Sequence, residues 1–240
     1  MAMNKKAKII TLSSIISVFL IGVIVFLCFV PTIQRNTEIK KYYKRKVAVF
    51  EMENLELGST SVVFLGDEMI ENYNLSVHFK KIYPLNRGIK NDSTSGILNR
   101  LDVSVVDIRP KVVVLQVGTH KLDKVLTYYE DILKTLKEKL PIADVVILSI
   151  CPTSGEYAGR NEKIVQINNE LKALAEKYNS TKATYKYVDI HSLLVNPETG
   201  ELDKSYSDDG LLLNEQGYSK ITEGTEQIDG VKDVVNECLL

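Results

Sequence analysis

Short apolar runs rich in β-branched residues alternate with helical segments through most of the chain. The clearest run, residues 112–117, reads Val-Val-Val-Leu-Gln-Val, a pattern typical of a strand buried on both faces. Residues 126–140 follow with apolar side chains at helical spacing. This alternation predicts parallel strands with right-handed helical crossovers, hence a three-layer α/β/α, doubly wound, five-stranded parallel sheet. The other expected strands are 61–65, 82–86, 145–150 and 185–190, and the other expected helices begin near residues 69, 93, 164 and 214.

The first expected strand runs directly into a Gly-Asp turn that opens a helix. Gly66 and Asp67 form this turn, and Glu68 follows them. In an open α/β sheet, ligands and reactive side chains gather where the carboxyl end of a strand meets a helix N-terminus. We therefore expect a functional site at residues 66–68.

A long uncharged segment precedes this region. Residues 9–30 contain no charged side chain, and as a helix rising about 1.5 Å per residue they would span about 33 Å, enough to cross a bilayer. A cleaved signal peptide and a buried core helix are the alternatives, although the run is long for a signal and no small-x-small cleavage site follows it. We expect four regions: a basic tail (1–8), a transmembrane anchor (9–30), a basic helical stalk whose apolar stripe docks on the domain (31–58), and the α/β domain (59–240).

Charge is distributed unevenly along the chain. The net charge of −1 comprises nine Lys/Arg against one Glu in residues 1–46, and 21 Lys/Arg against 30 Asp/Glu in the rest. An acidic domain argues against nucleic acid as a partner. The three Cys are too few for a disulfide framework, and only Cys151 and Cys238 could pair, because Cys28 lies in the apolar segment.

Four short blocks in the domain resemble the sequence blocks of the SGNH or GDSL hydrolases. Each block falls near a strand's carboxyl end or in the loop before the last helix, which favours a common site. The resemblance covers roughly residues 59–225 and implies the flavodoxin-like SGNH hydrolase fold. The blocks are Gly66-Asp67-Glu68, Asn86-Arg87-Gly88, Gly118-Thr119-His120 and Asp209-Gly210-Leu211-Leu212-Leu213-Asn214.

The resemblance also implies roles for individual positions. Glu68 stands in the place of the nucleophilic Ser, His120 in that of the oxyanion-hole Asn, and Leu212 in that of the catalytic His. Asp209 matches the Asp that orients the His, and the backbone N–H of Gly88 matches an oxyanion donor. The matched binding positions are Asp67, Asn86, Arg87 and Thr119.

These substitutions bear directly on activity. Ester hydrolysis of this design needs a Ser nucleophile and a His base, whereas Glu68 is a weak nucleophile and Leu212 cannot carry a proton. We therefore expect a catalytically inactive pseudo-esterase that acts as a binding or structural module, with His120 pairing with Glu68 to offset its charge.

Two alternatives keep some chemistry. In one, Glu68, His120 and Asp209 converge in a rebuilt site, as an acid–base pair or as metal ligands, and act on ester or acetylated envelope substrates. In the other, His191 replaces the missing base of an esterase.

The expected partners follow from the anchor and from the family. They are the lipid bilayer and an acylated carbohydrate or other envelope ligand, and no cofactor is expected. The basic residues after the apolar segment favour a cytoplasmic domain, but anchored members of the family usually act outside the membrane. We expect a single-pass cell-membrane protein with an extracytoplasmic domain. Within that domain, His78 lies in a polar segment near lysines, and we expect its side chain to be solvated.

Overall fold

The structure, a computed structural model, describes part of the chain. It divides into two units, Met1–Arg45 and Lys46–Leu240, and helix α1 (Lys5–Glu56) contains the boundary between them. The described ranges are 5–57, 60–80 and 82–226, and the side chains of residues 5–25, 27–29 and 224–226 lie outside the description.

The first unit contributes only helix to the described residues. Among the residues that the structure describes, no helix is long and apolar enough to cross a membrane. The side chains of the predicted anchor, residues 9–30, lie almost entirely outside this description.

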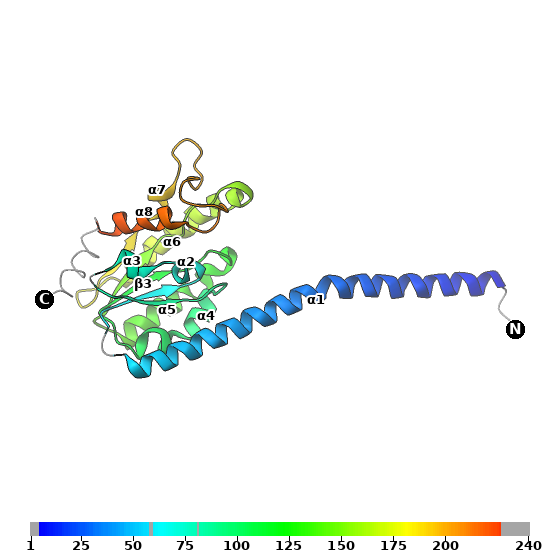
Figure 1. Ribbon diagram of the computed structural model, residues 1–240, viewed down its shortest axis with the longest axis horizontal. Helices are drawn as coiled ribbons and strands as arrows, with labels where there is room; N and C mark the ends of the chain where they lie inside the picture. Colours follow the sequence, from blue (N-terminus) through cyan, green and yellow to red (C-terminus); the bar gives the residue numbers. More distant parts are fainter. Residues whose placement is uncertain (1–4, 58–59, 81, 227–240) are drawn as a thin grey trace. The chain divides into compact units, whose positions relative to one another are not determined.

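The second unit is built on one parallel sheet (Figure 1). Its five strands lie in the order β2-β1-β3-β4-β5, as the sequence predicts for a doubly wound sheet. The chain passes from β1 to β2 on one side of it and then crosses to β3 on the other side. Strands β1 and β3 therefore flank the point where ligands bind in such folds. The strands are β1 (Val62–Gly66), β2 (Leu85–Gly88), β3 (Val112–Gln116), β4 (Asp144–Leu148) and β5 (Tyr185–Val188).

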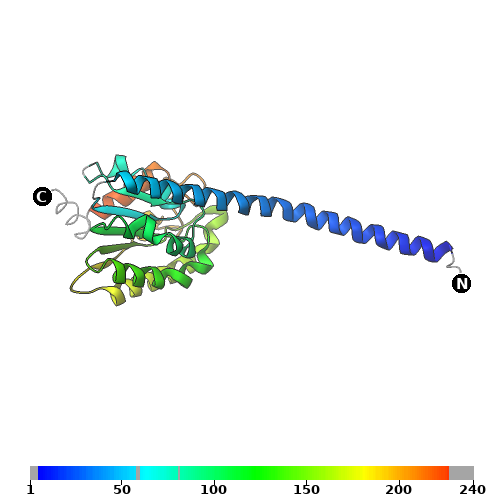
Figure 2. The ribbon, with the colours of Figure 1, turned by 90° about the horizontal axis from the view of Figure 1, so that it is seen from below.

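Helices cover both faces of the sheet because successive strand side chains point to opposite sides. Val63 and Leu65 pack in one apolar cluster and Val62 and Phe64 in another. The first cluster includes side chains of α4 (Thr94–Asn99), α5 (Val125–Lys139) and α6 (Asn161–Tyr178), and α5 and α6 lie side by side in Figure 2. The second includes side chains of α2 (Glu68–Glu71), α3 (Leu75–His78), α7 (His191–Leu194) and α8 (Glu215–Glu226).

Several element boundaries differ from the sequence prediction. The helix expected from residue 93 ends at Asn99 and is followed by a π-helix, η1 (Asp102–Val106). Strand β2 begins later than the expected strand 82–86 and also contains Arg87 and Gly88, which we expected to follow it. The physical reason is that Gly66 pairs with Gly88, so the ladder continues to the last residue of β1. Two 3₁₀ segments, η2 (Leu122–Lys124) and η3 (Gly155–Arg160), precede α5 and α6.

The last turns of α1 belong to the α/β unit and are anchored through Arg87. The Phe50 ring is 2% exposed, and its centroid lies 4.5 Å from the Arg87 guanidinium carbon. Glu53 forms an ion pair with Arg87, and Asn54 Oδ1 accepts a hydrogen bond from it at 2.8 Å. Phe50, one of the apolar residues of the predicted stalk, therefore packs against the domain.

The prediction that His78 is solvated is wrong. Its side chain is 6% exposed, with Nε2 3.1 Å from a Glu215 carboxylate oxygen and Nδ1 3.0 Å from the Thr222 hydroxyl. The reason is that α8 packs over this segment, and the lysines near His78 in the sequence gave no indication of that contact.

Candidate functional site

Asp67 joins the loops that follow β1 and β3. Its side chain is fully buried, and Oδ2 accepts hydrogen bonds from the backbone N–H groups of Gly118 at 2.9 Å and Thr119 at 2.8 Å. Oδ1 accepts from the Met69 N–H and the Thr119 hydroxyl, both at 3.0 Å, so Asp67 also caps α2. Because Glu68 follows Asp67 and His120 follows Thr119 in the chain, these bonds place Glu68 and His120 at the same edge of the sheet.

Glu68 is held between two basic side chains. Its side chain is 3% exposed, with Oε1 2.6 Å from Lys90 Nζ and Oε2 2.5 Å from His120 Nε2. The contact between Glu68 and His120 that the sequence predicts is therefore present. Both carboxylate oxygens are engaged, which leaves Glu68 poorly placed to attack a substrate. We call Glu68, Lys90 and His120 the ion-pair trio.

Lys90 is the member of the trio that sequence reasoning missed. The hydrogen bond that Lys90 donates to Glu68, together with the negative charge of Glu68, raises the pKa of Lys90, against the smaller opposing effect of burial. Lys90 therefore stays protonated and compensates the buried carboxylate. Its own backbone N–H donates to Glu71 Oε2 at 2.5 Å, and Glu71 Oε1 lies 2.9 Å from Lys46 Nζ of α1.

The second block is occupied with contacts inside the protein. Asn86 Oδ1 accepts a hydrogen bond from the Gly88 N–H at 2.9 Å, and Asn86 Nδ2 donates to the carbonyl oxygens of Ile70 at 2.7 Å and Tyr73 at 3.1 Å. The N–H that the resemblance assigns to the oxyanion is thus already bonded. Arg87 is 1% exposed and is held by α1 through Glu53 and Asn54.

Asp209 and Leu212 are not brought into contact with the trio. Among the described residues, the hydrogen bonds to Asp209 come from its own loop, with Oδ1 accepting the N–H groups of Leu211 and Leu212 at 2.8 Å. Partial burial raises the pKa of Asp209, but these backbone bonds and one from Ser207 outweigh it, so that the pKa is lowered. Leu212 packs against the apolar cluster that includes α8.

Of the rebuilt site, the structure brings together Glu68 and His120, whereas the hydrogen bonds to Asp209 among the described residues come from its own loop. In the part of the chain that the structure describes, no three His, Cys, Asp or Glu side chains are grouped to hold a metal ion. His191 Nε2 is buried with no hydrogen-bond partner among residues 5–57, 60–80 and 82–226, and burial lowers the pKa of His191 despite the nearby Asp189.

The structure describes only one of the two cysteines that the sequence suggests could pair. Cys151 is free, and burial raises the pKa of its thiol to about 12. Cys238, with which it could pair, lies outside the described residues.

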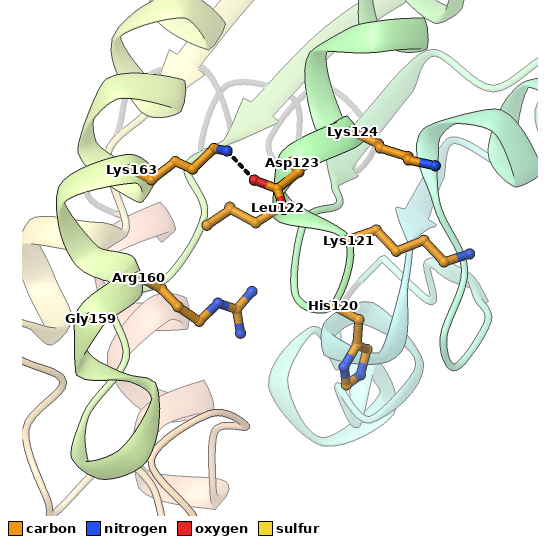
Figure 3. Close-up of a pocket in the computed structure, with 8 residues that line it drawn as sticks. All are labelled: His120, Lys121, Leu122, Asp123, Lys124, Gly159, Arg160 and Lys163. Atoms are coloured by element: carbon orange, nitrogen blue, oxygen red, sulfur yellow. Dashed lines mark hydrogen bonds and ion pairs between the residues drawn. The ribbon is translucent and has the colours of Figure 1, made fainter. Parts of the chain in front are cut away.

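A pocket of about 510 Å³ opens beside the trio (Figure 3). Arg160, at the end of η3, extends across it toward His120, and its Nη2 donates to the Thr119 carbonyl at 2.5 Å. Neither Arg160 nor the pocket was expected from the sequence. The lining residues are His120, Lys121, Leu122, Asp123, Lys124, Gly159, Arg160 and Lys163.

The order of the strands, and the turn after β1 in which Asp67 accepts hydrogen bonds from the loop after β3, define a three-layer α/β fold of the SGNH hydrolase kind. The model of the GDSL-like Lipase/Acylhydrolase family matches residues 63–220, and the chain belongs to this family.

Individual relatives agree with this assignment. The chain is 31% identical over 121 residues to the human platelet-activating factor acetylhydrolase IB subunit alpha1, covering 47% of this chain and 52% of that protein. It is 27% identical over 189 residues to the Drosophila melanogaster subunit beta homolog, covering 73% and 79%. A solved structure of a Streptococcus pneumonia protein named for platelet activating factor has a TM-score of 0.73 at 22% identity, covering 85% of this chain and 98% of that one. The chain thus spans about half the length of the first of these relatives.

Proposed function

We propose that this protein is a catalytically inactive member of its family that serves as a binding or structural module. The observation that carries the proposal is the ion-pair trio: Glu68 stands in the place of the nucleophile, and both its carboxylate oxygens are engaged by Lys90 and His120. A carboxylate in the place of the nucleophile puts negative charge next to the position where an oxyanion would develop. Catalysis of acyl transfer needs the opposite arrangement, with hydrogen-bond donors aimed at that position.

The contacts of two other residues that match catalytic positions of the family support the same proposal. Leu212, in the place of the base, packs in an apolar cluster, and the Gly88 N–H is bonded to Asn86. Loss of the nucleophile or base alone costs on the order of 10⁶ in turnover in a studied triad of another fold. Several such losses together leave no ordinary route to hydrolysis, although the fold that would bind a ligand is retained.

We further propose that the module is attached to a membrane through residues 9–30, with the α/β unit on the extracytoplasmic side. The support for attachment is the uncharged 22-residue run, and the extracytoplasmic side is inferred from anchored members of the family, against the basic residues that follow the run. An acylated carbohydrate or another envelope component is then the ligand that such a module would meet.

An esterase assay with a reconstruction series tests the proposed inactivity. The wild-type protein should not hydrolyse p-nitrophenyl acetate above background, with or without added divalent metal. The triple variant E68S/H120N/L212H should gain measurable activity, because it restores the nucleophile, the oxyanion donor and the base. The double variant E68S/H120N is the matched control and should stay inactive, because a Ser without a base remains protonated.

The same assay identifies the alternatives. A wild-type rate that disappears in E68Q would replace the proposal with a rebuilt site. A wild-type rate that survives E68Q but is lost in H191A would indicate an esterase that uses His191. The restored activity of the triple variant should be small, because a displacement of about 1 Å already costs about 10²-fold.

A further inference from the structure

The pocket beside the trio is basic within an acidic part of the chain. Besides His120, four of its lining side chains are basic, Lys121, Lys124, Arg160 and Lys163, whereas Asp123 is the one acidic side chain in the lining. Beyond residue 46, the chain has 21 Lys/Arg against 30 Asp/Glu. A local reversal of charge in a concave site raises the concentration of anions there.

Arg160 is the side chain best placed to bind such an anion. It is partly buried and fixed by its bond to the Thr119 carbonyl, and Figure 3 shows its guanidinium in the space between η3 and His120. No carboxylate forms an ion pair with it among the described residues, and no other hydrogen bond from its guanidinium is found there. Burial lowers the pKa of Arg160, opposed by the charges of Tyr157, Asp67 and Asp123, so this cation is partly desolvated without a direct counter-ion.

The other charged groups leave the space open for an anion. Asp123 is paired with Lys163, and this lysine lowers the pKa of Asp123 through a hydrogen bond and its charge. Lys121 and Lys124 extend away from Arg160 in Figure 3. They therefore add to the positive field of the site without filling the space before the guanidinium.

We infer that this pocket, the Arg160 pocket, binds the oxyanion group of a small ligand, either a phosphate or a carboxylate. The planar guanidinium matches both groups through two parallel N–H bonds. A volume of about 510 Å³ lies within the range of roughly 300–1,000 Å³ that is usual for small-molecule sites. The inference rests on the proposed function, because it names the ligand class of a site that binds without hydrolysing.

Calorimetric titration of the full chain tests this inference, with inorganic phosphate and acetate as probes at constant ionic strength. Saturable binding of at least one probe, at one site per chain, is the expected result. Binding of phosphate alone assigns the phosphate class, and binding of acetate alone assigns the carboxylate class. If neither probe binds the wild-type chain, the inference is wrong.

Substitutions of Arg160 test whether the probe binds in the Arg160 pocket. R160Q should weaken binding at least about tenfold, since it removes a charge-assisted pair, and R160K should weaken it less. R109Q is the matched control, because it removes the same charge from an exposed arginine outside the pocket and should leave affinity unchanged. Equal effects of R160Q and R109Q would show only general electrostatic attraction and would overturn the inference.

A variant that should bind the probe more tightly keeps the test valid even if R160Q fails to fold. D123N removes the acidic lining side chain and frees Lys163, so it should strengthen binding about threefold or more. Unchanged or weaker binding in D123N counts against the inference. The outcome is separable from that of the esterase assay: failed binding leaves the inactivity intact, whereas wild-type hydrolysis refutes the inactivity without removing the oxyanion site.

Discussion

At the scale of single residues, the trio turns a reactive position into a charge-compensated one. Glu68 is buried, and a buried carboxylate is costly unless it is paired and hydrogen-bonded. Lys90 and His120 supply both partners. The contacts that compensate the charge of Glu68 also engage both of its carboxylate oxygens.

The variant E68Q measures how much this compensation contributes. It should lower the free energy of unfolding by about 1–3 kcal/mol, because it leaves Lys90 without its counter-ion and replaces the carboxylate that His120 contacts. Denaturant unfolding checks this value. E130Q is the control, since Glu130 pairs with Lys177 on the surface, and it should leave stability unchanged. Equal stability of E68Q and wild type would mean that the trio carries no net stabilisation.

Only part of this site could be predicted from the sequence. The Glu68–His120 contact follows from two blocks placed after neighbouring strands. Lys90 and Arg160 lie in a loop and a 3₁₀ segment, where no periodic pattern shows which way a side chain points. Their roles depend on how β2 and α6 are placed by the sheet, and that information is not local.

At the scale of elements, the end of α1 acts as part of the α/β unit. Phe50 covers Arg87 and also lies 5.9 Å from Arg100, measured from its ring centroid to the guanidinium carbon. Arg100 in turn donates to the Gly66 carbonyl and to the Arg87 carbonyl, both at 2.9 Å. The helix is therefore connected to the ends of β1 and β2, where the candidate site lies.

The variant F50A tests this connection. Loss of the ring should destabilise the α/β unit by about 3–5 kcal/mol, because it leaves a cavity beside two buried arginines. V49A, on the neighbouring exposed side chain, is the control and should change stability by no more than about 0.5 kcal/mol. A denaturation midpoint of F50A close to that of V49A would show that α1 adds little to the unit.

The strands were more predictable than their connections. Runs such as Val112–Gln116 are apolar and β-branched, so burial on both faces follows from composition. The ladder between Gly66 and Gly88 could not be foreseen in the same way, because glycines carry no side-chain pattern. A Cβ on Gly88 would lie 2.1 Å from the Glu71 backbone nitrogen, so this close approach requires glycine.

At the scale of the whole molecule, the proposed anchor makes a direct prediction. The full chain should stay in the membrane fraction after carbonate washing, because an uncharged 22-residue helix partitions into the bilayer. A variant that lacks residues 9–30 should be released by the same wash. Full-length chain in the wash supernatant, still carrying its first residues, would refute the anchor.

The trio also bears on the history that such a site can have. Glu68→Ser alone would leave Lys90 without its counter-ion, and His120→Asn alone would take one partner from a buried carboxylate. Each single step back toward a hydrolase therefore costs stability before it restores any activity, and Leu212→His would add a polar group to an apolar cluster. If the protein is inactive as proposed, the mutual dependence of these side chains would oppose the return of ester hydrolysis through single substitutions.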